Sequence, residues 1–158
     1  GYISFRFKKG FIMKLTTKGR YSVMAMLDLA LNESRGPITL SEISGRQDIS
    51  LSYLEQLFSK LRKQGLVKSS RGPGGGYELA QEAGDISISK IILAVDESVD
   101  IRRCKGDGNC HGGHGCITHD LWTDLSGQIN NFLESISIGE LMKRRDMSDT
   151  KLCNNIQL

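Results

Sequence analysis

Three cysteines and one histidine form the group of residues in this sequence with the clearest chemistry. Cys104, Cys110 and Cys116 repeat at intervals of six residues, and His119 follows three residues after the last of them. Thiolates are soft ligands that suit zinc, copper(I) or iron–sulfur clusters. The group therefore predicts a metal centre in a loop rich in glycine.

The spacing favours an iron–sulfur cluster and leaves zinc open. Structural zinc usually takes its ligands in short C-x2-4-C pairs, which this segment lacks. A [2Fe–2S] cluster needs four ligands, and histidine can replace cysteine on one iron, so three thiolates and one imidazole supply the number required. His119 directly precedes a predicted long helix, which should hold its backbone in place. His111 and His114 lie in the loop and remain competing ligands.

The alternatives to a metal centre are unliganded thiols in a flexible loop, or a redox switch that forms one disulfide. The N-terminal stretch lacks the apolar segment and cleavage site of a secretory signal, so a reducing, cytoplasmic location is expected. Clustered thiols in such a compartment favour metal. No apolar run approaches the roughly 18 residues that span a bilayer, and no membrane partner is expected. Cys153, near the end of the chain, is expected to be unliganded.

The charge of the chain matters through its placement. The chain has 158 residues, of which 39% are hydrophobic and 25% are charged, an ordinary mix for a globular protein. A formal net charge of +3 does not by itself indicate a nucleic-acid partner. Between Lys60 and Arg71, however, the sequence holds five basic residues and no acidic one. A basic stretch of this kind is typical of a surface that meets DNA.

The apolar spacing predicts a mainly α fold with a small β wing, in the order of a winged helix-turn-helix. Helices are expected over residues 17–31, over a short stretch capped by Thr39, and over 51–64, with residues 47–50 as the turn. In the last of these helices one apolar stripe is formed by Leu54, Leu57, Phe58 and Leu61. Ser52 and Glu55 are expected to form a capping box. The wing strands are expected over 66–70 and 77–80, on either side of the glycine-rich tip 71–76.

The second half of the chain is expected to hold a helix over residues 87–95, the cysteine loop, and a long amphipathic helix. One face of that helix carries Leu121, Leu125, Ile129, Phe132, Leu133 and Ile136. A short helix is expected near Ser137. The expected division is a tag or upstream extension (1–12), a winged helix-turn-helix domain (13–98), an iron–sulfur loop (99–120), dimerisation and C-terminal helices (121–142) and a flexible tail (143–158).

The second helix of the predicted helix-turn-helix exposes polar residues suited to DNA. The N-terminal part of such a helix reaches base edges in the major groove, where Gln56 can pair with adenine. Ser52 and Tyr53 can donate to bases or phosphates. Arg71 at the wing tip can enter a minor groove or hold a phosphate. Glu55 should repel phosphate, so it either caps the helix or discriminates between DNA sequences. The alternative for all of them is a solvated polar helix face.

Several segments together resemble the bacterial iron–sulfur cluster regulators of the IscR family, which are winged helix-turn-helix transcription regulators. The resemblance covers about residues 13–141. It is carried by the three spaced cysteines and by the segments 13–16, 18–21, 50–58, 71–77, 94–100 and 118–119.

The resemblance implies a homodimer that binds a [2Fe–2S] cluster. The matching ligand positions are Cys104, Cys110, Cys116 and His119, with the iron–sulfur assembly machinery as the cluster donor. The long helix would be the dimerisation helix and would cross to the wing domain of the partner. The extra histidines noted above depart from the family pattern.

The resemblance also implies operator DNA as the partner and no enzymatic activity. The protein with its cluster would bind one DNA motif and repress cluster-assembly genes, and the cluster-free protein would still bind a second motif. Glu55 matches the residue that weakens binding to one operator class in the cluster-free state. The DNA-contacting positions of the family fall on Ser52, Tyr53, Gln56, Arg71 and Pro73.

Three alternatives remain. Nitric-oxide-sensing relatives share the fold and the three cysteines, but bind a [4Fe–4S] cluster completed by an aspartate, where this sequence has Arg20. A small iron–sulfur carrier or electron-transfer protein would not need the wing and its basic residues. A hydrolase using Cys116 and His119 lacks an orienting third group and an element to bind an oxyanion.

Overall fold

The computed structural model describes residues 17–97 and 115–155, with side chains described up to residue 149. Contacts divide the chain into two compact units. The larger unit comprises Leu15–Ser98 and Asn131–Leu158, and the smaller comprises Gly1–Lys14 and Val99–Asn130. The predictions for residues 1–12 and for Cys104, Cys110, His111 and His114 lie outside the described residues.

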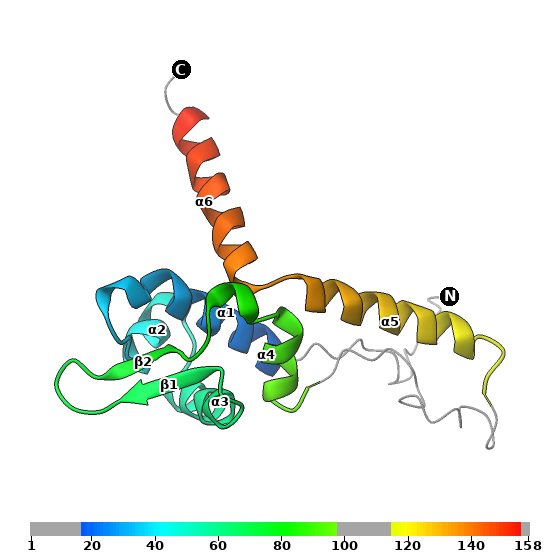
Figure 1. Cartoon of the computed structure of the whole chain (residues 1–158), viewed down its shortest axis with the longest axis horizontal. Coiled ribbons are helices and arrows are strands. Elements are labelled where there is room, and N and C mark those ends of the chain that lie inside the picture. The colour runs from blue at the N-terminus through cyan, green and yellow to red at the C-terminus, as the bar shows by residue number, and fades with distance from the viewer. Residues whose placement is uncertain (1–16, 98–114, 156–158) are drawn as a thin grey trace, which may run out of the picture. The chain divides into compact units, whose positions relative to one another are not determined.

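The first part of the larger unit has the predicted order of helices and strands. The fold is mainly helical with one two-stranded antiparallel sheet, so the predicted fold class is confirmed. Figure 1 shows the hairpin of the two strands extending beyond the helices. The elements are α1 (Thr17–Asn32), η1 (Glu33–Arg35), α2 (Leu40–Gln47), α3 (Leu51–Lys63), β1 (Val67–Ser70), β2 (Gly76–Leu79), η2 (Ala83–Asp85) and α4 (Ile88–Ala94).

The core of this unit is aliphatic around one aromatic ring. Leu54, Leu57, Phe58 and Leu61 recur at helical spacing on α3 and are all buried. The ring of Phe58 is fully buried and meets the ring of Tyr77 edge-on, with 5.0 Å between centroids. This contact fixes helix α3 against strand β2 of the wing.

Helix α2 begins with the cap that the sequence predicts. The Oγ1 of Thr39 accepts a hydrogen bond from the backbone N–H of Glu42, and the Glu42 carboxylate accepts one from the Thr39 backbone, which completes a capping box. The hydrogen bonds donated by Thr39 lower the pKa of Glu42 below its ordinary value. The start of the helix-turn-helix is therefore held by local bonds.

The cap of α3 differs from the prediction. The N-cap is Ser50, whose Oγ accepts a hydrogen bond from the Tyr53 backbone N–H at 3.3 Å. The predicted capping box of Ser52 and Glu55 is wrong, because the helix already begins at Leu51 and Ser52 lies inside its first turn. Both side chains are exposed instead.

The wing depends on a close approach of backbones at its base. Strands β1 and β2 pair antiparallel, with Val67 opposite Leu79, and the bridge between Ile38 and Tyr77 joins β2 to the segment before α2. A Cβ on Gly76 would lie 2.6 Å from the Ile38 carbonyl oxygen. Only glycine therefore allows the bridge that docks the wing on the helices.

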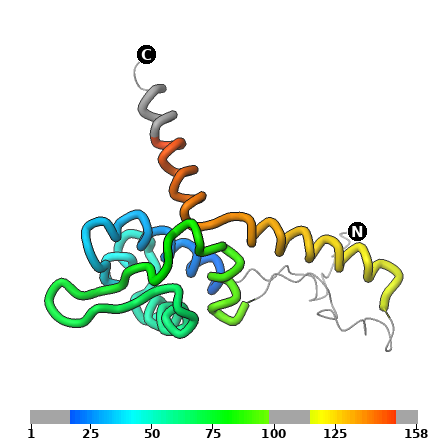
Figure 2. Tube along the Cα trace, viewed as in Figure 1, coloured from blue at the N-terminus to red at the C-terminus, as the bar shows by residue number. Residues whose placement is uncertain are grey.

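The C-terminal half of the chain holds α5 (His119–Ser135) and α6 (Ile138–Asn155), and the residues between them return to the core of the larger unit. The backbone N–H of Ile88 donates to Ile136, and that of Ile138 donates to Ile86, both at 2.9 Å. The side chains of all four residues are buried. Figure 2 traces the chain through this connection. Ile136 thus belongs to the core of the larger unit rather than to the apolar face of α5 that the sequence predicts.

Helix α6 continues to Asn155, through most of the segment from residue 143 that the sequence analysis expects to be a flexible tail. Arg144 lies one turn after Glu140 and pairs with it at 3.3 Å, and the Ser148 hydroxyl donates to the Arg144 carbonyl. Such i,i+4 contacts extend a helix whose surface is polar. Within the described part of the chain, no helix has the length and apolar character needed to cross a membrane.

Candidate nucleic-acid interface and metal-ligand segment

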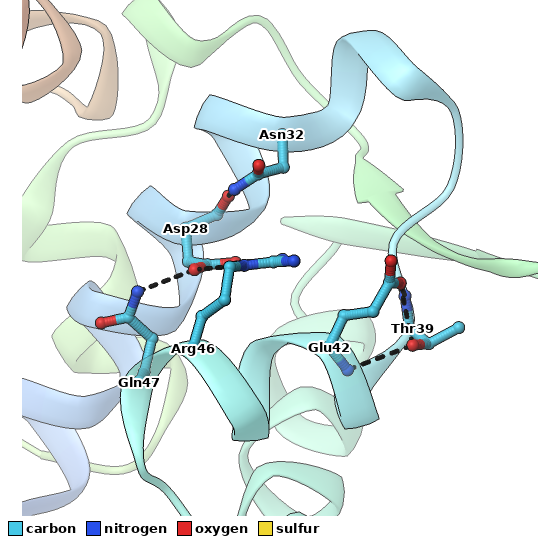
Figure 3. Close-up of polar contacts among 6 residues, drawn as sticks. All are labelled: Asp28, Asn32, Thr39, Glu42, Arg46 and Gln47. Carbon is cyan, nitrogen blue, oxygen red and sulfur yellow. Dashed lines mark hydrogen bonds and ion pairs between the residues drawn. The ribbon is translucent and has the colours of Figure 1, made fainter.

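A buried carboxylate holds the first helix of the helix-turn-helix against α1. The side chain of Asp28 on α1 is 2% exposed and accepts hydrogen bonds from Arg46 Nη2 and Gln47 Nε2 on α2, both at 2.7 Å. Arg46 Nε donates to the same carboxylate at 3.0 Å. Figure 3 shows both donors converging on Asp28 from the end of α2. Because these bonds are charge-assisted and partly buried, they fix the angle at which α2 crosses α1.

The turn between α2 and α3 is tight and internally bonded. Asp48 adopts a left-handed conformation with φ of 54°, which ends α2. The Ser44 hydroxyl donates to the Ile49 carbonyl at 2.6 Å, and the Ile49 side chain is buried beneath the turn. The turn thus sets where the recognition helix α3 begins, which is what positions its first residues for a DNA groove.

The first two turns of α3 present the polar residues that the sequence predicts. Ser52, Glu55 and Gln56 are exposed, whereas Tyr53 is half-buried and meets the ring of Tyr21 on α1 edge-on, with 6.0 Å between centroids. Burial raises the pKa of the Tyr53 phenol above its ordinary value of 10.0. The phenol therefore keeps its proton near neutral pH and can act as a hydrogen-bond donor.

The wing tip is exposed and lies in a turn that requires glycine. Arg71 and Pro73 are both exposed, and the Gly75 N–H donates to the Gly72 carbonyl at 2.9 Å. A Cβ on Gly75 would lie 2.5 Å from the Ser70 carbonyl oxygen. Among the described side chains, Arg71 forms no ion pair. Its charge is thus available to an external anion.

Replacing Arg71 by alanine should weaken binding to duplex DNA and lower its salt dependence. Each phosphate contact contributes roughly 0.9 to the slope of log K against log salt, so losing one contact should reduce the slope by about one. Titrations of a labelled duplex at several salt concentrations measure this. Lys68→Ala is the matched control, because Lys68 lies on the same hairpin but pairs with Glu78 at 3.8 Å. A slope unchanged by the loss of Arg71 would exclude a phosphate contact there.

An ion pair missed by the sequence analysis joins the recognition helix to the start of the cysteine segment. Lys60 Nζ on α3 lies 2.5 Å from Asp96 Oδ2, and this bond lowers the pKa of Asp96 below its ordinary value of 3.8. The neighbouring Glu97 accepts a hydrogen bond from the backbone N–H of Gly19 in α1 at 2.9 Å. No spacing pattern predicts these contacts, because the partners lie 36 and 78 residues apart.

Two of the four predicted metal ligands lie in the described part of the chain, one turn apart. The backbone N–H of His119, the first residue of α5, donates to the Cys116 carbonyl at 2.9 Å, and both side chains are half-buried. Residues 17–97 and 115–149 contain no set of three histidine, cysteine or acidic side chains able to hold a metal ion. The other two predicted ligands, Cys104 and Cys110, lie outside the described residues.

Helix α5 presents an unusual amount of apolar surface. Leu121, Leu125 and Phe132 are 56%, 42% and 59% exposed, and Ser126 is the only residue of this helix that is buried. The predicted amphipathic helix is therefore present, but within one chain its apolar side chains remain largely in solvent. Exposed apolar patches on a helix of this length mark an interaction surface.

Comparison with known proteins places the chain among transcription regulators. Residues 15–144 match the family model Rrf2, described as an iron-dependent transcriptional regulator. The HTH-type transcriptional regulators IscR of Enterobacter sp. (strain 638) and of Citrobacter koseri are each 59% identical over 137 residues, 87% of this chain and 84% of the relative.

Two solved structures extend the comparison to the fold. The IscR of T. potens is 37% identical with a TM-score of 0.70, covering 85% of this chain and 90% of that one. The CymR of B. subtilis, described as the global cysteine regulator, is 32% identical with a TM-score of 0.74, covering 84% and 98%. All these relatives are regulators rather than enzymes. The chain belongs to the Rrf2 family of iron-dependent transcriptional regulators.

Proposed function

We propose that this transcription regulator binds operator DNA as a homodimer and changes its sequence specificity with the occupancy of a [2Fe–2S] cluster. Its targets would be genes for iron–sulfur cluster assembly, whose machinery would supply the cluster. The observation that carries the proposal is the pair of contacts made by Asp96 and Glu97. They tie the start of the cysteine segment to α3, which carries candidate DNA-reading residues, and to α1.

The donor set fits the proposed cluster. Cys104, Cys110, Cys116 and His119 offer three thiolates and one imidazole, the number that a [2Fe–2S] cluster requires. A backbone hydrogen bond holds the turn between Cys116 and His119, so these two ligands lie at the ordered start of α5. The cluster, when bound, supplies an iron- and oxygen-sensitive signal. The protein itself must transmit this signal to the residues that meet DNA.

We propose that the cluster affects DNA binding through the stretch of chain between Glu97 and Cys104. Only six residues lie between them, so ordering the cysteines restrains the segment that begins at Asp96. Lys60 can pair either with Asp96 or with a DNA phosphate, but not fully with both. A change in the position of Asp96 would therefore change the charge that α3 offers to DNA. This is a coupling between two sites, carried by named contacts.

Some residues of the candidate DNA face would position the protein on the duplex, and others would read its sequence. Arg71 and Pro73 at the wing tip would position the protein on the DNA backbone, and Ser52, Tyr53 and Gln56 would meet base edges or phosphates. Glu55 is also exposed on α3 and does not cap this helix, which supports a role in rejecting some DNA sequences.

We propose that a second copy of this chain covers the apolar face of α5. A dimer places two recognition helices on successive turns of the duplex, which is how helix-turn-helix proteins read palindromic sites. Burying the exposed side chains of α5 against the same helix of a partner also removes them from water.

The test is an anaerobic preparation of the wild type and of two alanine variants. Wild-type protein should be coloured and contain two irons and two sulfides per chain, as the proposed cluster requires. Cys116→Ala and His119→Ala should lose that cluster, and both should bind one fixed set of DNA sequences whatever the iron supply. Cys153→Ala is the matched control and should resemble the wild type.

Two outcomes of this test would contradict the proposal. Four irons per chain would favour the nitric-oxide-sensing relatives with a [4Fe–4S] cluster. A coloured wild type whose DNA preference equals that of the cluster-free variants would separate the cluster from specificity, and the function proposed here would be wrong.

A further inference from the structure

A threonine between the two described ligands makes two side-chain contacts that matter for a bound cluster. The Oγ1 of Thr118 accepts a hydrogen bond from the indole Nε1 of Trp122 at 3.0 Å. The same oxygen lies 3.8 Å from the Sγ of Cys116. All three residues lie within one short segment, from the end of the cysteine loop to the first turn of α5.

The direction of these bonds follows from the chemistry of the groups. An indole N–H is a donor only, so the Thr118 oxygen must be the acceptor toward Trp122. The hydroxyl still has its own proton, which it can donate in a second bond. A cysteine that ligates a metal is a thiolate and has no proton to give. Between Thr118 and a ligating Cys116, therefore, only the hydroxyl can be the donor.

The backbone holds this arrangement in place. The His119 N–H donates to the Cys116 carbonyl, and the Trp122 N–H donates to the Thr118 carbonyl at 3.2 Å. A Cβ on Gly115 would lie 3.5 Å from the Cβ and Cγ of His119, so the chain before Cys116 packs against the histidine. Thr118 is thus fixed between the two ligands by the turn and by the first turn of α5.

We propose that Thr118, oriented by Trp122, is a positioning residue that donates a hydrogen bond to the Cys116 thiolate and thereby sets the reduction potential and retention of the cluster. This inference rests on the proposed function, since it needs a cluster on Cys116. A hydrogen bond to a ligating sulfur withdraws negative charge from it. Because the reduced cluster carries one more negative charge, the bond stabilises the reduced form more and raises the potential.

The experiment measures the midpoint potential and the rate of cluster loss in air for the cluster-loaded full chain and its variants. Thr118→Val keeps the shape but removes the hydroxyl. One net hydrogen bond corresponds to roughly a threefold to tenfold change in the reduction equilibrium. At about 59 mV per tenfold for a one-electron couple, the potential should fall by about 30–60 mV. The visible absorption bands that report on the sulfur ligands should shift, and cluster loss should be faster.

Three further variants isolate the hydroxyl. Thr118→Ser keeps it and should keep the wild-type potential. Trp122→Phe leaves the hydroxyl free to rotate and should lower the potential by a smaller amount. Thr123→Val is the matched control, because the Thr123 hydroxyl on α5 is buried without a hydrogen-bond partner among the described residues. It should leave the potential unchanged. If Thr118→Val fails to hold a cluster that Thr118→Ser holds, the proposed retention role is supported directly.

The outcomes separate this inference from the function on which it rests. A wild-type chain that takes up no cluster overturns both. A loaded wild type whose potential, spectrum and stability in air are unchanged by Thr118→Val overturns only the role of Thr118. Equal shifts in Thr118→Val and Thr123→Val also overturn it, because they would arise from the packing of α5 rather than from a bond to Cys116.

Discussion

Replacing Asp28 by alanine should lower the free energy of unfolding by about 2–3 kcal/mol. The substitution leaves the Arg46 guanidinium and the Gln47 amide without the buried carboxylate that both now contact. Breaking a buried pair costs roughly 3–5 kcal/mol, but Arg46 is 34% exposed, so water compensates part of the loss. Urea denaturation of the wild type and the variant measures the difference.

The same substitution should weaken DNA binding under conditions in which the protein remains folded. Asp28 holds the last turn of α2, and α2 with its tight turn sets the start of α3. A double-mutant cycle with Arg46→Ala isolates the pair. The loss of unfolding free energy in the double variant should be smaller than the sum of the losses in the two single variants, by at least about 1 kcal/mol, as expected for residues in direct contact. Additive effects would show that Asp28 acts through packing alone.

The local parts of this fold could be predicted from the sequence because local rules determine them. The leucine spacing of α3 and the cap at Thr39 depend on residues within one or two turns, and both are confirmed. The cap of α3 shows the limit of such rules. Ser50 and Ser52 are both able to cap, and the choice between them depends on where the buried Ile49 ends the turn.

The contacts that could not be predicted join distant parts of the chain. Ile136 and Ile138 continue the apolar pattern of a helical region, so periodicity assigns them to the long helix or its successor. In the structure Ile136 lies outside both helices and Ile138 begins α6, and backbone hydrogen bonds join both to the segment 86–88 in the core. Periodicity gives the face on which a residue lies, but not the surface that covers that face.

The candidate site likewise combines features that local patterns predict with contacts between distant residues that they do not predict. The exposure of Ser52, Glu55 and Gln56 follows from the pattern, because they are the polar residues of a helix whose apolar stripe faces the core. The partners of Lys60 and Gly19 do not, since four elements of structure lie between Lys60 and Asp96, and more lie between Gly19 and Glu97. The basic run from Lys60 to Arg71 consequently overstates the charge available to DNA, as Lys60 and Lys68 already have acidic partners.

Replacing Leu125 by aspartate should convert the proposed dimer into monomers and weaken operator binding by about 10²–10⁴-fold. A carboxylate in the middle of an apolar contact is costly to desolvate, and two would face each other across a symmetric interface. Monomers lose the gain in affinity that comes from two linked DNA-binding modules on one site. Sedimentation measures the mass, and titration of a palindromic duplex measures the affinity.

Leu93→Asp is the matched control, because Leu93 on α4 is also an exposed leucine, 61% accessible, but lies off α5. It should leave both the mass and the affinity unchanged. The comparison is informative because a general effect of surface charge would act on both variants, whereas a dimer built on α5 is sensitive only to the first. If both variants remain dimers, the apolar face of α5 does not hold the two chains together.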